Sequence, residues 1–173
     1  MLASNELIIR REQPSDYDEI KQVIQLAFED APYSAQQEHL IVQTLRSAGA
    51  LNLGIVAQIS ADIIGFAGIS PVQISDGAAH WYGLGPIAVL PRFQGQSVGS
   101  MLVDDILSRL KSRGAAGCVV LGDPDFYGRF GFEPDQRLEF ANFGPELFQS
   151  IRFNDNLPQG EVTYHPAFYS QTD

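Results

Sequence analysis

The chain has 173 residues, about one domain, and 45% of them are hydrophobic against 18% charged, a composition that excludes a disordered tail. No apolar run approaches the ~18 residues of a membrane span, and the first residues lack a signal peptide's basic and apolar regions, so we expect no membrane partner. The formal net charge of −10 repels a phosphate backbone and argues against nucleic acid, whereas it suits a cationic amine or simply maintains solubility.

The N-terminal part of the sequence predicts a strand and two helices. Residues 6–11 form the strand, and the first helix begins with Ser15 as its N-cap. Its apolar residues recur at helical spacing as far as Phe28. Ser34 and Gln37 have the spacing of a capping box, which predicts the start of the second helix.

The middle of the sequence favours β-structure. Residues 54–59 and 63–74 form two strands joined by a short hairpin connection, and residues 81–90 form a third. Gly83 and Gly85 interrupt this third strand. Glycines inside a strand indicate a β-bulge or the close approach of another group to the backbone.

Helices and strands alternate in the remainder of the sequence. The predicted elements are a helix over residues 98–113, a strand over 117–121, a short helix over 125–129, a helix over 145–151 and a strand over 161–164. A run of strands followed by strand–helix–strand predicts an α+β fold with a mixed sheet, antiparallel first and parallel at the crossover. We expect residues 1–173 to form a single domain.

Cys118 is the single cysteine, so an internal disulfide is excluded and a reducing cytoplasm is expected. It lies in the apolar run CVVL without a neighbouring His or basic residue, which predicts a buried, unreactive thiol. The three histidines are widely separated, and none has a Cys or carboxylate at ligand spacing. The sequence therefore predicts no metal site.

Residues 87–103, IAVLPRFQGQSVGSMLV, pass from a strand through a Gly-containing loop directly into an amphipathic helix. The first-turn N–H groups of such a helix lack intrahelical acceptors and point at the loop with the positive end of the helix dipole. This arrangement suits a pyrophosphate. It is no Walker loop, since Gly-Lys-Ser/Thr is missing, and no Rossmann fingerprint, since hairpin strands precede it.

The segment resembles the acetyl-CoA loop V-x-P-x-x-Q-G-x-G-x-G of the GNAT (Gcn5-related) N-acetyltransferases. The matching residues are Val89, Pro91, Gln94, Gly95 and Gly99. Three further segments are similar to this family, and together they span essentially the whole chain. They are IIRREQPSDYDEI at the start, LGDPDFYGRFGFEP over residues 121–134, and G-x-V-x-Y-x-x-A-F over residues 160–168.

The resemblance implies a GNAT-like fold and acetyl-CoA as co-substrate, with no metal. The cofactor-binding residues that it implies are Ile87, Ala88, Val89, Gln94, Gly95, Gln96, Ser97, Val98, Gly99, Ser100 and Tyr127. The chain departs from the family at Ser97, where the pattern has Gly. Because the backbone N–H is kept, we expect altered CoA affinity rather than loss of binding.

The same resemblance implies roles for individual groups. The backbone of residues 87–89 pairs with the pantetheine arm like an extra strand, and an N–H near Ile87 polarises the thioester carbonyl. Tyr127 matches the family's general acid, because a phenol stays protonated at neutral pH and can supply a proton to the departing thiolate.

The general base is not fixed by the sequence. Glu38, on the second helix where this fold lines its acceptor pocket, is the first candidate. The alternatives are His39, Asp123, His80 and His165, or a water chain to a remote carboxylate. Aromatic residues that either line the acceptor pocket or belong to the core are Phe28, Tyr33, Trp81 and Tyr82.

The implied activity is transfer of an acetyl or longer acyl group from acyl-CoA to a primary amine of a small-molecule or peptide acceptor. Without an activated cysteine, the amine attacks the thioester directly in a ternary complex. The alternative is a non-catalytic CoA-binding module that serves as a sensor or protein-interaction partner. A homodimer is compatible with the resemblance.

Overall fold

The computed structural model describes residues 6–32, 34–144 and 146–169. The strands are β1 (Leu7–Arg11), β2 (Leu53–Ile59), β3 (Asp62–Pro71), β4 (Gln73–Ile74), β5 (Trp81–Val89), β6 (Gly117–Leu121), β7 (Glu133–Pro134), β8 (Leu138–Glu139), β9 (Phe148–Arg152) and β10 (Gly160–Thr163). The α-helices are α1 (Tyr17–Phe28), α2 (Glu38–Ser47), α3 (Val98–Ser112) and α4 (Pro124–Tyr127). Short 3₁₀ helices are η1 (Pro14–Asp16), η2 (Pro91–Phe93), η3 (Gly128–Phe130) and η4 (Pro166–Phe168).

The main sheet is mixed, as the sequence predicts. Over the described residues it has seven strands in the order β1-β2-β3-β5-β6-β9-β7. Neighbouring strands are antiparallel except β5 and β6, which are parallel and are connected through α3. The α+β prediction, antiparallel first and parallel at the crossover, is confirmed.

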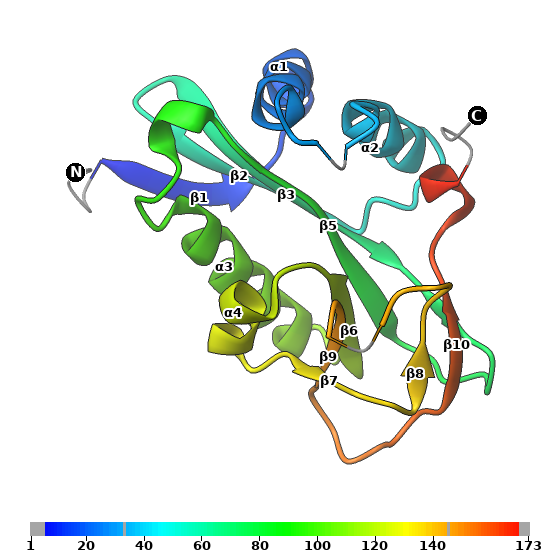
Figure 1. Ribbon diagram of the computed structural model, residues 1–173. Helices are drawn as coiled ribbons and strands as arrows, with labels where there is room; N and C mark the ends of the chain where they lie inside the picture. Colours follow the sequence, from blue (N-terminus) through cyan, green and yellow to red (C-terminus); the bar gives the residue numbers. More distant parts are fainter. Residues whose placement is uncertain (1–5, 33, 145, 170–173) are drawn as a thin grey trace.

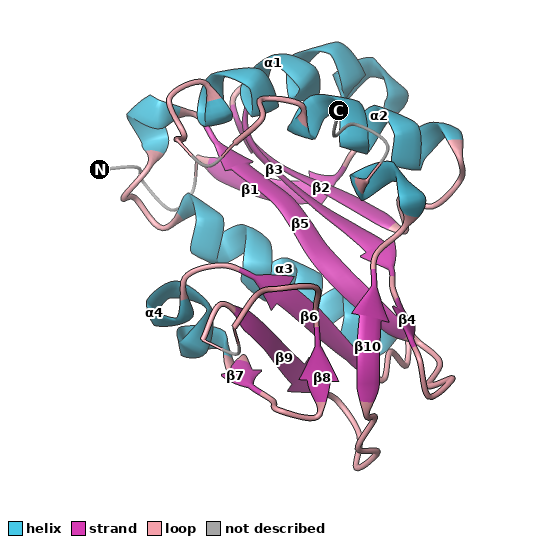
Figure 2. Cartoon of the chain, turned by 45° about the vertical axis from the view of Figure 1, so that its right-hand side comes forward, coloured by secondary structure: helices cyan, strands magenta, loops and turns pink. Residues whose placement is uncertain are grey.

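Helices cover both faces of this sheet (Figure 1). The helices α1 and α2 lie on one face, and α3 lies on the other with α4 beside it. Leu102 and Ile106 of α3 are fully buried in one hydrophobic cluster, and Ile20 and Ile24 of α1 belong to another. A smaller sheet, β4-β10-β8, packs around Trp81 on the face of α1 and α2 (Figure 2). No helix in the described ranges has the length and apolar character to cross a membrane.

The strands β5 and β6 form a fork. They pair at Trp81–Gly117, Tyr82–Cys118 and Gly83–Val119, and the pairing stops there although β5 continues for six residues to Val89. Beyond Gly83 the two strands therefore diverge. In this sheet, the fork opens a gap between two central strands that would otherwise exchange hydrogen bonds.

Both interrupting glycines of β5 have the structural roles that the sequence suggests. Ala67 and Ile69 of β3 oppose Ile87 and Leu84, so β5 carries one extra residue, and this bulge contains Gly85 with φ +147°. A Cβ added to Gly83 would lie 2.8 Å from the Tyr164 ring, so glycine permits close approach of that ring to the strand.

Three local predictions are wrong. Residue 15 is not the N-cap of the first helix: η1 precedes α1, and Asp16 occupies the N-cap. The Ser34–Gln37 capping box is absent, because the Ser34 hydroxyl donates to the Glu38 carboxylate and Gln37 occupies the N-cap of α2 without a side-chain bond. The short-range spacing was compatible with a cap, but the Ser34 hydroxyl binds the Glu38 carboxylate instead of a helix N–H.

The third error concerns residues 145–151, for which we predicted a helix. Phe148–Arg152 form β9 instead, antiparallel to β6 and buried at Phe148, Gln149 and Ser150. Residue 145 lies outside the described residues. The physical reason is tertiary, because β6 exposes backbone groups along its free side and pairing with β9 satisfies them.

The cysteine prediction is confirmed. Cys118 is fully buried on β6, and burial raises the pKa of its thiol far above the ordinary value. The thiol therefore stays protonated and unreactive in the folded protein.

Candidate active site

The loop that precedes α3 forms the first part of the site. Gly95 has φ +75°, and Ser97, the N-cap of α3, has φ 68° and ψ 11°. Both residues are in the left-handed region, which turns the chain sharply into the helix. The 15-residue helix α3 thus presents its first-turn N–H groups and its positive dipole end to the loop.

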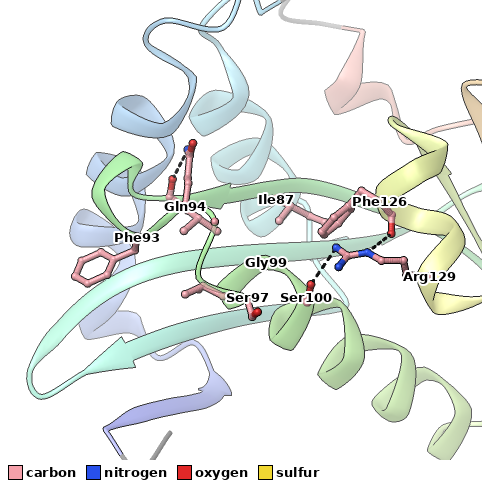
Figure 3. Close-up of a pocket in the computed structure, with 11 residues that line it drawn as sticks. Ile87, Phe93, Gln94, Ser97, Gly99, Ser100, Phe126 and Arg129 are labelled. Atoms are coloured by element: carbon pink, nitrogen blue, oxygen red, sulfur yellow. Dashed lines mark hydrogen bonds between the residues drawn. The ribbon is translucent and has the colours of Figure 1, made fainter. Parts of the chain in front are cut away.

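A cavity of about 440 Å³ lies at this end of α3. Strand β5, the loop, the first turn of α3 and the α4–η3 segment all contribute to it (Figure 3). Its lining residues are Ile87, Val89, Phe93, Gln94, Gly95, Ser97, Val98, Gly99, Ser100, Phe126 and Arg129.

The backbone of β5 faces the fork at alternate residues. The Leu90 N–H donates to the Ile64 carbonyl at 2.9 Å, toward β3. In an antiparallel pair the direction alternates, so the backbone groups of Ile87 and Val89 face away from β3 and into the fork. The Val89 carbonyl accepts a hydrogen bond from Gln94 Nε2 at 3.0 Å, which fixes the loop against the strand.

Arg129 supplies a positive charge to the cavity. Its Nη2 donates to Ser100 Oγ at 3.3 Å and its Nε to the Phe126 carbonyl at 3.4 Å, while the guanidinium lies 4.9 Å from the centre of the Phe126 ring. These contacts hold the guanidinium beside the first turn of α3 (Figure 3). Cation and helix terminus together favour an anionic ligand in a chain that is otherwise strongly acidic.

The structure places most of the predicted cofactor residues at this cavity. Those that line it are Ile87, Val89, Gln94, Gly95, Ser97, Val98, Gly99 and Ser100. Ala88 faces the opposite side of the sheet and is buried against the α1 cluster. Gln96 donates from Nε2 to the Arg92 carbonyl at 3.1 Å.

Sequence reasoning missed Phe93, Phe126 and Arg129 as lining residues. The last two lie in the segment over residues 121–134 that resembles the family's second cofactor segment. Their separation of three residues places them on one side of the α4–η3 turn. This spacing was the available signal for both.

Tyr127 follows Phe126 on α4 and lies outside the cavity lining. Its half-buried ring contacts Gly122, where an added Cβ would lie 2.5 Å from the ring, and meets Phe132 edge-on at 5.8 Å. This position is at the end of β6, across the fork from β5. Asp123 is exposed and caps α4 by accepting the Asp125 N–H at 2.9 Å.

The remaining base candidates lie in separate places. Glu38 accepts a hydrogen bond from Ser34, and His39 lines a groove between α1 and α2. Burial and then the Lys21 charge lower the pKa of His39. His80 is exposed in the turn before β5, and His165 accepts the Ala167 N–H through Nδ1 at 3.0 Å.

The aromatic residues considered for an acceptor pocket belong mainly to the core. Trp81 is buried under the small sheet, and Tyr82 and Phe28 pack at the edges of the two other clusters. Tyr33 lies outside the described residues. Within the described part of the chain, no group of three or more His, Cys, Asp or Glu side chains could hold a metal ion.

A fork between parallel strands that opens beside a helix N-terminus suited to an anion is typical of the acyl-CoA-dependent N-acyltransferase class. Residues 18–132 match the acetyltransferase (GNAT) family, and the chain belongs to that family. It is an N-acetyltransferase by this membership.

Relatives and solved structures agree with the family. The chain is 37% identical over 169 residues to the uncharacterized N-acetyltransferase YhbS of Escherichia coli K12, covering 94% of this chain and 98% of YhbS. The structure of a GNAT family acetyltransferase from Brucella melitensis, in complex with acetyl-CoA, has a TM-score of 0.84 and 43% identity, covering 94% and 97% of the two chains. The structure of E. coli YhbS in complex with CoA has a TM-score of 0.87 and 34% identity, covering 95% and 92%.

Proposed function

We propose that this chain, as one N-acetyltransferase domain, transfers an acetyl group from acetyl-CoA to a primary amine by direct attack in a ternary complex. The observation that carries the proposal is the junction of the β5–β6 fork with the N-terminus of α3, beside Arg129. The Brucella and E. coli proteins, which were solved with acetyl-CoA and CoA, support this choice of co-substrate.

The residues present fit the co-substrate. The first-turn N–H groups of α3 and the Arg129 guanidinium would bind the pyrophosphate. The fork-facing backbone groups of Ile87 and Val89 would hold the pantetheine amides as a neighbouring strand would. The Ile87 N–H would then lie close to the thioester carbonyl and polarise it.

The chain's own groups then handle the protons. The amine nitrogen forms a bond to the carbonyl carbon, the carbon–sulfur bond breaks, and the thiolate leaves with the bonding electrons. Tyr127 donates its phenolic proton to that thiolate. The amine's surplus proton goes to a base, for which Glu38 remains our candidate, either directly or through water.

Calorimetric titration with acetyl-CoA, and separately with CoA, tests the co-substrate site. The variant is Gly99→Glu, because a Cβ at Gly99 would make only ordinary contact, 3.6 Å from Phe126 Cζ, and the carboxylate would reach the cavity. Gly99→Gln is the matched control of similar shape. We expect Gly99→Glu to bind acetyl-CoA and CoA at least about tenfold more weakly than Gly99→Gln does, because the added carboxylate repels the phosphates.

Wild-type protein that binds neither ligand would overturn the proposal. Given binding, a screen of primary amines for CoA release tests turnover. Tyr127→Phe is expected to lower kcat by roughly 10²- to 10⁴-fold without changing the acetyl-CoA Kd, and Tyr17→Phe on α1 serves as control. CoA binding without turnover of any amine would instead favour the non-catalytic CoA-binding module.

A further inference from the structure

Two buried hydroxyl groups in this protein lack hydrogen-bond partners among the described residues. They belong to Ser70 on β3 and to Tyr164, directly after β10. Ser70 is 0% exposed and Tyr164 is 7% exposed, so bulk water does not satisfy either group. An unsatisfied buried hydroxyl costs about 1–3 kcal/mol, so two of them near each other call for a ligand or another partner.

Both hydroxyl-bearing residues flank Gly83, the last residue of β5 that pairs with β6. Ser70 lies directly opposite Gly83 in the β3–β5 ladder, so its side chain points to the face that a Gly83 side chain would occupy. On that same face, the Gly83 Cβ position is 2.8 Å from Tyr164 Cε2 and 3.2 Å from Cζ, which carries the hydroxyl. Ser70 and Tyr164 therefore both lie beside Gly83, at the closed end of the fork.

The Tyr164 phenol is also in electrostatic reach of groups across the fork. Burial raises its pKa far above the ordinary value, and Cys118 on β6, Tyr169 and Tyr127 on α4 raise it further. The phenol consequently remains neutral and keeps its proton as a hydrogen-bond donor. The Tyr164 ring packs against Phe140 and Phe168, whose side chains carry no acceptor for the phenolic proton.

We propose that Ser70 and Tyr164 form the acyl-group subsite of this enzyme, where their hydroxyls donate hydrogen bonds to the thioester carbonyl oxygen. This inference rests on the proposed function, because a co-substrate held along Val89 and Ile87 directs its acyl end toward Gly83. Both side chains are buried, which suits the terminal acetyl group better than an acceptor that must enter from solvent. Ser70 pairs with Gly83 whereas Ala67 pairs with Ile87, about 10 Å along the ladder, so the hydroxyls and the Ile87 N–H are alternative donors and this proposal places the carbonyl oxygen at the hydroxyls.

A comparison of acetyl-CoA with CoA isolates this subsite, since CoA lacks the acyl carbonyl but keeps every other group. The variants are Tyr164→Phe and Ser70→Ala, each of which removes only a hydroxyl. The matched controls are Tyr17→Phe in the groove between α1 and α2, and Ser108→Ala at an exposed position of α3. We expect Tyr164→Phe to weaken acetyl-CoA binding about fivefold to tenfold and CoA binding less than about twofold.

Equal weakening of both ligands, or no weakening of either, would overturn the acyl subsite while leaving the proposed function intact. Wild-type protein that binds neither ligand would overturn the proposed function and the subsite with it. A second measurement does not depend on variant stability: in wild-type protein labelled at tyrosine ¹³Cζ, the Tyr164 resonance is expected to shift with acetyl-CoA and not with CoA. An identical shift with both ligands would count against the proposal.

Discussion

Arg129 donates a hydrogen bond from Nη2 to Ser100 Oγ at 3.3 Å and so links η3 to the first turn of α3. The contact spans the edge of the cavity, where two elements distant in sequence meet. It brings a side-chain cation and a helix terminus to the same place. Two properties of the site and two of the scaffold follow as predictions.

The first prediction concerns this cation. Arg129→Gln is expected to weaken acetyl-CoA binding about tenfold and to reduce the dependence of Kd on salt concentration, because one ionic contact to phosphate is lost. Calorimetry at two salt concentrations measures both effects. Arg92→Gln removes the same charge from the neighbouring loop outside the cavity lining and is expected to change Kd by less than about twofold. Equal effects of the two variants would show that only overall charge matters.

The second prediction concerns Ser97, which has the left-handed conformation that glycine adopts without strain. Ser97→Gly removes about 1–2 kcal/mol of backbone strain and adds up to about 1 kcal/mol of unfolded-state entropy. We therefore expect stability to stay equal or rise by up to about 1 kcal/mol in urea unfolding. CoA affinity is expected to change only a few-fold, since the backbone N–H is kept. If the wild-type protein bound no CoA and Ser97→Gly bound CoA tightly, the result would show that the serine blocks the site.

The third prediction compares the same substitution at two glycines. An added Cβ at Gly117 would lie 2.4 Å from the Trp81 ring and 2.6 Å from the Ile151 carbonyl, whereas at Gly128 it meets nothing within 4 Å. Gly117→Ala is therefore expected to lower the free energy of unfolding by about 1–3 kcal/mol, and Gly128→Ala to raise it by up to about 1 kcal/mol. Thermal or urea unfolding distinguishes them. A stable Gly117→Ala protein would mean that β5 and β6 separate easily at their paired end.

The fourth prediction concerns acid stability. Asp16 accepts two hydrogen bonds from Arg10, at 2.7 and 3.0 Å, and one from the Gln13 N–H, and these bonds lower its pKa, the Arg10 bond most of all. The folded state thus binds a proton less readily than the unfolded state. The resulting stability is complete above the ordinary aspartate range near ~4 and is lost as pH falls through the lowered pKa.

Asp16→Asn tests this directly. We expect Asp16→Asn to lower the free energy of unfolding by about 1–3 kcal/mol at pH 7. The difference between variant and wild type should narrow as the pH falls below ~4, because the wild-type protein then loses the same interaction. Urea unfolding at the two pH values measures the difference. Asp18→Asn, a change at an exposed position of α1, is the control and is expected to have a much smaller effect. If Asp16→Asn lowered the free energy of unfolding equally at both pH values, the effect would come from packing and not from the charge of Asp16.

The sequence predicted those parts of the protein that depend on near neighbours. The loop from Gln94 to Gly99 and its helix were recognisable because a strand, glycines and a helical repeat follow one another directly. The bulge at Gly85 was visible for the same reason. Local pattern also placed Cys118 correctly in a buried strand.

The errors and omissions share a non-local origin. Phe148–Arg152 form a strand because β6 needs a neighbour, and no residue within the segment reports this. Ser70 and Tyr164 lie 94 positions apart in the sequence, and the fold alone places both beside Gly83. The family resemblance included Tyr164, in the segment over residues 160–168, but gave it no role and did not include Ser70; the unsatisfied hydroxyls in the folded structure are the signal that connects them.

The short β5–β6 seam has a mechanical consequence. Strands β1-β2-β3-β5 form one part of the main sheet and β6-β9-β7 form the other, and three residue pairs connect the two parts. Beside the cavity, few backbone hydrogen bonds therefore hold the two parts together. A ligand bound between these two parts would restrain their relative motion, because it hydrogen-bonds to one part and packs against the other. We therefore expect occupancy to slow amide hydrogen exchange in β6 and β9, including residues that the bound molecule never touches.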